Sequence, residues 1–255
     1  MTHPGIVRWP PRPDARRRLI CCGFSGGGTV PFRDWADVVS ADVELVLLCL
    51  PGREDRFPEP AAEDWAGLFG DALAAVSTVL DKPYDLFGHS MGALVAYELT
   101  AHFERTGSRT PDALIVSSCE APSNWAHHLT VPPTAGDTDA ELEQWITSSG
   151  KLDPVLREEP ELLELALELL RADLCAAATY RYAAGPPLRT PVEFVHGVDD
   201  PDVDDEVVAR WRAATSGGFT ATRLPGGHFY TERDWSRLPA AFVSLAFDGK
   251  IGAHA

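Results

Sequence analysis

The sequence has too few basic residues to balance its acidic ones. Its 255 residues include 22 Lys and Arg against 38 Asp and Glu, which gives a formal net charge of -16 and an isoelectric point near 4.8. Nucleic acids and anionic membranes are themselves negative, so this balance excludes non-specific binding to either. We therefore expect no nucleic-acid partner and no membrane partner, and we interpret the acidity as a source of solubility.

The sequence contains only five cysteines, an odd number. The five stand at positions 21, 22, 49, 119 and 175, and no spacing among them matches a zinc site or a disulfide framework. Three of them lie in apolar, strand-like runs. The pattern predicts buried free thiols, which persist in reducing compartments.

Long hydrophobic runs are absent. No run is long enough to cross a bilayer, and the N-terminal residues lack the apolar core of a signal segment. Residues 1–18 are rich in Pro and Arg instead, which predicts a solvated leader. These absences predict a cytoplasmic protein, and a hydrophobic content of 45% suffices for a single domain over residues 1–255.

The markers of nucleotide binding are missing as well. Residues 23–28, Gly-Phe-Ser-Gly-Gly-Gly, follow a short apolar run and predict a loop with exposed backbone N–H groups. Neither the lysine and spacing of a P-loop nor the dinucleotide fingerprint is present. The use that remains is an oxyanion loop like that of esterases.

The stretch around which the chain is organised is residues 84–100. Its strand-like start ends abruptly in Gly-His-Ser-Met-Gly at residues 88–92, and a run of helix formers follows. Gly-x-Ser-x-Gly between a strand and a helix predicts a tight turn that exposes Ser90 as a nucleophile. A chance motif in a turn would lack these flanking elements.

Strand-like and helical patterns alternate along the chain, which predicts an α/β fold with a mostly parallel, doubly wound sheet. Strands are expected at 19–22, 43–50, 84–87, 113–116, 191–196 and 219–224, and helices near 32–39, 63–80, 92–105, 141–147, 160–182, 204–215 and 235–247. Between about 120 and 187 the pattern is helical only. It predicts a lid over a pocket for an apolar or acyl group, although helices that merely cover the sheet would give the same pattern.

Two later polar residues complete the order Ser, Asp, His that is typical of an α/β-hydrolase. His228 stands in a glycine-flanked loop and would take the Ser90 proton and return it to the leaving group. An aspartate after the strand at 191–196 would orient the histidine ring. Asp200 is the preferred candidate, with Asp199 as the alternative.

The oxyanion hole would use the backbone N–H groups of Met91 and Ser25. We expect structural roles for two other histidines. His89 is expected to pack beneath the turn, and His196 ends a strand.

The motifs together resemble a type II thioesterase of polyketide and nonribosomal peptide assembly lines. The residues that carry the resemblance are Phe24-Ser25-Gly26-Gly27-Gly28 with Phe32 and Trp35, Pro51-Gly52-Arg53-Glu54, Gly88-His89-Ser90-Met91-Gly92, Leu170-Arg171-Ala172-Asp173, Asp200-Pro201 and Pro225-Gly226-Gly227-His228-Phe229. The resemblance implies an α/β-hydrolase fold and the catalytic triad Ser90, Asp200 and His228, with no metal and no cofactor. It also implies hydrolysis of acyl or aminoacyl thioesters from the phosphopantetheine arm of an acyl or peptidyl carrier protein. The cellular role would be to clear stalled or misprimed carriers, and we expect a monomer.

The chain departs from the family pattern in two places. Residues 23–25 are Gly-Phe-Ser where Pro, an aromatic residue and Ala are usual, and Cys119-Glu120 replaces a common basic pair. These changes bear on acyl specificity more than on the class of enzyme.

Docking of a carrier protein raises an electrostatic requirement. Carrier proteins are commonly acidic, so this acidic chain would need a local basic patch. Residues 16–18 (three arginines), Arg53 and Arg56 are the candidates. Pairing of Arg53 and Arg56 with nearby acids is the alternative.

Two other functions remain open from the sequence. A tailoring esterase or acyltransferase with the same triad would turn over oxygen esters without a carrier. A non-catalytic module that shelters a pathway intermediate would have no need of an intact Ser-Asp-His set.

Overall fold

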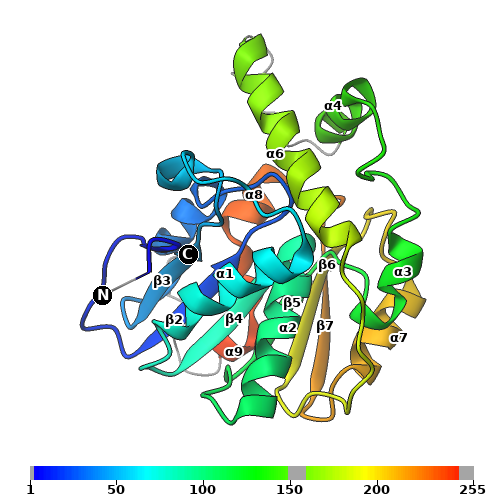
Figure 1. Cartoon of the computed structure of the whole chain (residues 1–255). Coiled ribbons are helices and arrows are strands. Elements are labelled where there is room, and N and C mark those ends of the chain that lie inside the picture. The colour runs from blue at the N-terminus through cyan, green and yellow to red at the C-terminus, as the bar shows by residue number, and fades with distance from the viewer. Residues whose placement is uncertain (1–2, 149–158, 247–255) are drawn as a thin grey trace.

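The computed structural model describes residues 3–148 and 159–246, and a seven-stranded sheet runs through its centre (Figure 1). The strand order is β1-β3-β2-β4-β5-β6-β7. The strands are β1 (Ile6–Arg8), β2 (Arg17–Cys22), β3 (Val43–Leu48), β4 (Tyr84–His89), β5 (Leu114–Ser117), β6 (Val192–Gly197) and β7 (Phe219–Leu224). Only β1 is antiparallel to its neighbour, so the predicted mostly parallel sheet is confirmed.

The winding of the sheet reverses between β2 and β4. The chain leaves β2 for β3 on one side and then returns to β4 on the other side. β2 and β4 are parallel neighbours with Cys22 opposite Gly88, so the loops after both strands emerge side by side. Such a reversal opens a crevice at the carboxyl ends of the strands, where α/β proteins bind ligands.

Helices cover both faces of the sheet, which explains why its central strands are almost continuously apolar. On one face α1 (Trp65–Ser77), α2 (Met91–Thr106) and α7 (Asp205–Ala213) share a core with Ile20 and Cys22. The alternating residues of the same strand, Leu19 and Cys21, face a second core. That core contains the 3₁₀ helix η1 (Val30–Asp37), α8 (Glu232–Ser236) and α9 (Val243–Ala246).

Side-chain caps and a glycine set the ends of these helices. The carboxylate of Asp64 accepts a hydrogen bond from Gly67 N at 2.8 Å and starts α1, and Asp204 does the same for Val207 N at the start of α7. α2 ends at Gly107, whose φ of +73° suits a residue without a side chain.

The described part of the segment between β5 and β6 consists of helices joined by loops. It forms η3 (Pro122–Asn124), α3 (Trp125–His128), α4 (Asp139–Ser148) and α6 (Pro160–Ala178), with no strand among described residues 120–148 and 159–187. Figure 1 shows α6 extending outward from the sheet with α4 beside its outer part. None of the helices in the described ranges has both the length and the apolar character needed to cross a membrane.

All five cysteines are free, as expected. Four are buried, whereas Cys175 on α6 is exposed.

The prediction of a solvated leader over residues 1–18 is wrong. β1 pairs with β3, and β2 begins at Arg17 rather than Leu19. Arg18 is buried and lies in register with Glu44 of β3, to which its Nε donates at 3.0 Å. The sequence hides this arrangement because the acidic partner lies 26 residues away along the chain.

The predicted C-terminal helix at 235–247 is also wrong in detail. The chain forms α8, then a 3₁₀ turn η4 (Leu238–Ala241), then α9. Pro239 lacks the N–H that a continuous helix would use, which explains the break. Residue 247 lies outside the described residues.

The buried arginine gives a stability prediction. Arg18→Met keeps an apolar side chain of similar length but removes the positive charge that pairs with the buried carboxylate of Glu44. We therefore expect the free energy of unfolding in urea to fall by about 3 kcal/mol. The matched control is Arg16→Met, because the Arg16 side chain is 76% exposed in its pair with Asp42. That control should change stability by less than about 0.5 kcal/mol. Equal losses in the two variants would contradict the structural role of Arg18.

Candidate active site

The turn between β4 and α2 holds Ser90 in a strained backbone conformation. Its φ is +53° and its ψ is -126°, a combination that side chains disfavour. A Cβ at Gly88 would lie 2.1 Å from the carbonyl oxygen of Gly92, and a Cβ at Gly92 would lie 2.3 Å from that of Cys22. Only glycine fits at both positions, so the sequence dictates the turn that presents Ser90.

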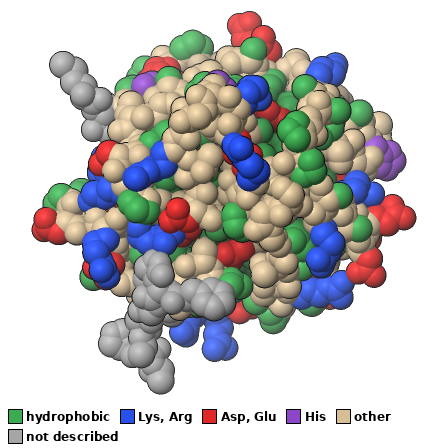
Figure 2. All heavy atoms as spheres, turned by 90° about the horizontal axis from the view of Figure 1, so that it is seen from below, with side chains coloured by type: hydrophobic (Ala, Val, Ile, Leu, Met, Phe, Trp, Pro, Cys, Tyr) green, Lys and Arg blue, Asp and Glu red, His purple; other side chains and the backbone are tan. Residues whose placement is uncertain are grey.

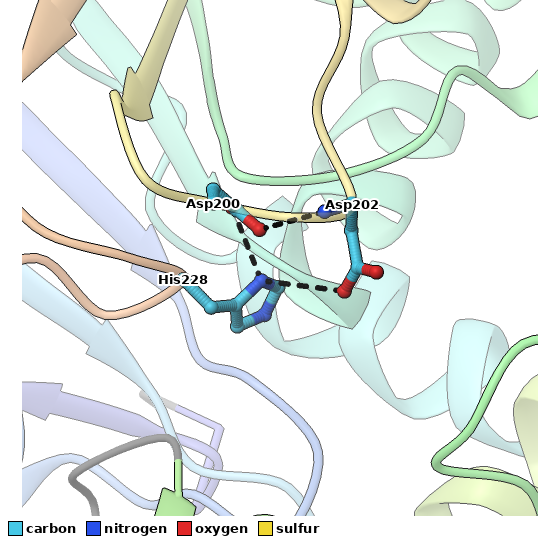
Figure 3. Close-up of side chains that lie close together, drawn as sticks. All are labelled: Asp200, Asp202 and His228. Atoms are coloured by element: carbon cyan, nitrogen blue, oxygen red, sulfur yellow. Dashed lines mark hydrogen bonds and ion pairs between the residues drawn. The ribbon is translucent and has the colours of Figure 1, made fainter.

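The loops after β6 and β7 bring His228 and Asp200 together (Figure 3). Nδ1 of His228 lies 3.3 Å from Oδ2 of Asp200. Gly197 permits this approach, because a Cβ there would lie 2.2 Å from the carbonyl oxygen of Gly227. Asp199 is exposed, so the structure places Asp200 rather than its neighbour beside the imidazole.

The environment keeps Asp200 ionised. Burial by itself raises the pKa of this carboxyl, but His228 and the backbone N–H of Asp202 outweigh it and hold the pKa below its usual value. A carboxylate that stays charged can fix the ring and stabilise an imidazolium.

Ser90 and His228 line the same pocket, of about 70 Å³. Ser25 and Met91 line it too, so four of the five residues predicted for the site meet there, and Asp200 lies beside His228 without lining the pocket. Met91 opens α2, and the first N–H groups of a helix have no intrahelical acceptor. The other walls come from the segment between β5 and β6 and from the loop after β6: Trp125, His128, Leu129, Pro133, Thr134, Ala135, Trp145, Leu174, Ala177, Ala178 and Asp202.

A buried ion pair fixes the glycine loop next to the turn. Arg53 forms a two-pronged contact with Asp173 of α6, at 2.8 and 3.0 Å, and also donates to the carbonyl oxygen of Gly27 at 2.8 Å. Asp173 accepts the N–H of Gly26 at 2.7 Å. These contacts tie the loop that carries Ser25 to α6, and the sequence assigned no such role to Asp173.

The five arginines expected to form a docking patch do not form one: Arg17 and Arg18 are buried, and Arg16 is exposed but pairs with Asp42. Arg53 and Arg56 are buried, and Arg56 pairs with Asp71 and Glu59. The alternative of pairing with nearby acids is therefore the correct one. On the face seen from below the view of Figure 1, basic and acidic side chains are interspersed (Figure 2).

His89 and His196 have the structural settings that the sequence predicts. His89 is buried, with Nδ1 2.9 Å from the hydroxyl of Ser117 and its ring among aromatic side chains. His196 is buried, with Nδ1 3.0 Å from the carbonyl oxygen of Gly197. Neither residue lines the pocket.

Sequence reasoning missed Asp202. Its Oδ2 lies 4.0 Å from Nδ1 of His228, and its side chain is 29% exposed at the pocket wall (Figure 3). The available signal was its place two residues after Asp200 in the same loop, but a spacing of two does not reveal that both side chains face one ring.

Within the described residues, Asp200, Asp202 and His228 also form the one group with the spacing of a metal site, their ligand atoms lying within 4.8 Å of one another. A cation among them would take the place of the proton on Nδ1 that an orienting aspartate requires. The resemblance implies no metal, and Asp200 and His228 already have a role as members of the expected triad.

Comparisons with known proteins agree on one family. The family model described as "Thioesterase domain" matches residues 17–242. Thioesterase PikA5 of Streptomyces venezuelae is 34% identical over 238 residues, which are 91% of this chain and 82% of that protein. The AMB antimetabolite synthetase AmbE of Pseudomonas aeruginosa is 35% identical over 213 residues, 84% of this chain but only 10% of that protein.

A solved structure extends this likeness to the fold. The type II thioesterase BorB from the borrelidin biosynthetic cluster matches with a TM-score of 0.81 and 32% identity. The match covers 98% of each chain. The predicted α/β-hydrolase type of fold is thereby confirmed.

The contact between Arg53 and Asp173 yields a prediction for the reactivity of Ser90. Arg53→Lys removes the two-pronged contact that fixes the glycine loop, so labelling of Ser90 by a fluorophosphonate should slow on the order of tenfold. The control is Arg210→Lys, which breaks a similar two-pronged contact with Glu120 (2.9 and 2.8 Å) away from that loop.

Labelling rates are compared per folded molecule, with melting temperatures measured for both variants. Equal labelling rates in the two variants would show that the loop does not depend on Arg53.

Proposed function

The chain belongs to the thioesterase family, and from that premise we propose that it hydrolyses acyl or aminoacyl thioesters on the phosphopantetheine arm of a carrier protein. The relatives with known structures include type II thioesterases of polyketide and nonribosomal peptide pathways. The role that fits them is the removal of acyl groups from stalled or misprimed carriers. The observation that supports the chemistry is the contact between His228 and Asp200 at a pocket that also exposes the strained Ser90.

The first half of the reaction forms an acyl-enzyme. The Ser90 hydroxyl attacks the thioester carbonyl carbon while His228 Nε2 accepts its proton, and Asp200 stabilises the resulting imidazolium through Nδ1–H. The negative oxygen accepts hydrogen bonds from the N–H groups of Met91 and Ser25. The C–S bond then breaks, and the imidazolium protonates the departing thiolate of the arm.

The second half releases the acid. A water molecule gives a proton to His228 and attacks the ester carbonyl of the acyl-enzyme. The C–O bond to Ser90 breaks, the serine oxygen regains the proton, and the carboxylic acid leaves. Asp200 stays ionised throughout, in keeping with its lowered pKa.

The segment between β5 and β6, in its described residues 120–148 and 159–187, acts as the lid in this proposal. Trp125 of α3, Trp145 of α4 and Leu174 of α6 all line the pocket. A pocket of about 70 Å³ with aromatic walls suits a short acyl group.

The decisive experiment is mass spectrometry of an acyl-phosphopantetheinyl carrier protein after incubation with the enzyme. Wild type should remove the acyl mass and leave the holo-carrier, whereas Ser90→Ala should leave the acyl-carrier intact. Acyl groups that persist with wild type across several chain types would contradict the proposal. Faster cleavage of carrier-free oxygen esters would favour the esterase or acyltransferase alternative.

A matched pair of variants tests the choice of Asp200. Asp200→Asn should lower kcat about 10³- to 10⁴-fold, because the amide cannot stabilise the imidazolium. Asp199→Asn changes an exposed carboxylate in the same turn and should stay within about twofold of wild type. Steady-state hydrolysis of a soluble acyl thioester measures both. Similar activities in the two variants would rule out the assigned role of Asp200.

A further inference from the structure

The Asp202 carboxylate faces the pocket, and no donor among the described residues forms a hydrogen bond with it. It lines the pocket together with Ser90 and His228, and Nδ1 of His228 lies 4.0 Å from its Oδ2. Within the described residues no hydrogen bond reaches either carboxylate oxygen; the bond at this residue comes from its backbone N–H, which donates to Asp200. A half-buried carboxylate in this position is ready to accept a donor from a ligand.

Nothing else in the pocket wall neutralises this charge. Its lining contains no Lys or Arg among the described residues. His128 also faces Asp202, but burial lowers the pKa of its ring, which favours the neutral form. Burial, and then the negative charge of Asp200 behind His228, raise the pKa of the Asp202 carboxyl, and a bound cation would offset both effects.

Aromatic rings complete the surroundings. Trp125 and Trp145 line the same pocket, and the Trp145 ring centroid lies 6.2 Å from that of His228. An aromatic face attracts a cation through its quadrupole, and the attraction grows when water is excluded. A carboxylate that lines one pocket with two indole rings makes an environment that favours an ammonium group over a methyl group of similar size.

We propose that Asp202 is a specificity-determining residue that selects acyl groups bearing a protonated amine. This inference rests on the proposed thioester hydrolysis at Ser90 and names the substrate class of that site. The ammonium group donates to the Asp202 carboxylate while the indole rings of Trp125 and Trp145 flank it.

The position of Asp202 also sets where the amine must stand. Asp202 faces Nδ1, the nitrogen of His228 that turns away from Ser90 in the proposed mechanism. An amine on the carbon next to the carbonyl stands nearer to the atom that Ser90 attacks than an amine further along the acyl chain. Amines on the second or third carbon from the carbonyl reach further and should therefore be preferred.

Isosteric pairs of thioesters on one carrier protein test this selection. β-Alanyl is compared with butyryl, and 4-aminobutyryl with pentanoyl, so that each pair differs only by an ammonium in place of a methyl. The quantity measured is the ratio of kcat/KM for the amine to that for its isostere. In wild type we expect the ratio to exceed one, and in Asp202→Asn we expect it to fall about tenfold, the value of one charge-assisted hydrogen bond.

The adjacent exposed carboxylate provides the control. Asp199→Asn removes the same charge from the same loop outside the pocket and should leave the ratio unchanged. Asp202→Ser repeats the test with a smaller polar side chain, in case the amide alters the loop, and should lower the ratio as Asp202→Asn does.

The outcomes separate the inference from the function on which it rests. If the Asp202 variants lower kcat/KM equally for both members of each pair, Asp202 acts through His228 or the pantetheine arm and not on the amine. That result would overturn the inference. An unchanged ratio in both Asp202 variants would overturn it as well. Failure of wild type to hydrolyse any of the four thioesters would instead contradict the proposed function.

Discussion

The close approach of β2, β4 and α2 at the turn around Ser90 is the constraint on which the site depends. The carbonyl oxygen of Cys22 lies so near Gly92 that no side chain fits there, and the carbonyl oxygen of Gly92 excludes one at Gly88. The serine is therefore held at the carboxyl edge of the sheet with a positive φ. The exit of β2 lies against the same turn, so the glycine loop cannot be far from it.

The other groups reach this turn through equally close contacts between loops. β6 and β7 are parallel neighbours, and the loops after them touch where Gly197 meets the carbonyl oxygens of Gly226 and Gly227. Those contacts bring Asp200 to His228. On the other side, α6 contributes Asp173, whose contacts with Arg53 and Gly26 hold the glycine loop in place. Three separate parts of the chain thus meet at one pocket, each fixed by contacts that tolerate little change.

The features that the sequence predicts well are those with a local signal. The turn at Ser90, the glycine-flanked His228 and the aspartates after β6 each come directly after a strand, and the loops at the carboxyl ends of parallel strands share one edge of a sheet. The apolar runs give five strands close to their observed bounds, because strands buried on both faces leave a largely apolar pattern, and the sixth, β7, is a more exposed edge strand of mixed sequence. The sequence also contained the break at Pro239, and the prediction of an uninterrupted helix overlooked it.

The features that escape prediction depend on partners distant in sequence. Arg18 and Arg53 look like surface charges until Glu44 and Asp173 are placed beside them, 26 and 120 residues away. The short edge strand β1 is stabilised by pairing with β3 rather than by its own composition. Asp202 belongs to this group as well, because only the path of its loop turns its carboxylate into the pocket.

The proposed mechanism depends most on Ser90 carrying the acyl group between the two halves of the reaction. We would quench the wild-type enzyme with an acyl thioester at times shorter than one turnover, digest it and locate the added mass. The mechanism predicts an acyl ester on the peptide that contains Ser90, formed and lost at the rate of turnover. Turnover without any acylated peptide, or with the acyl group on another nucleophile such as the exposed Cys175, would contradict it.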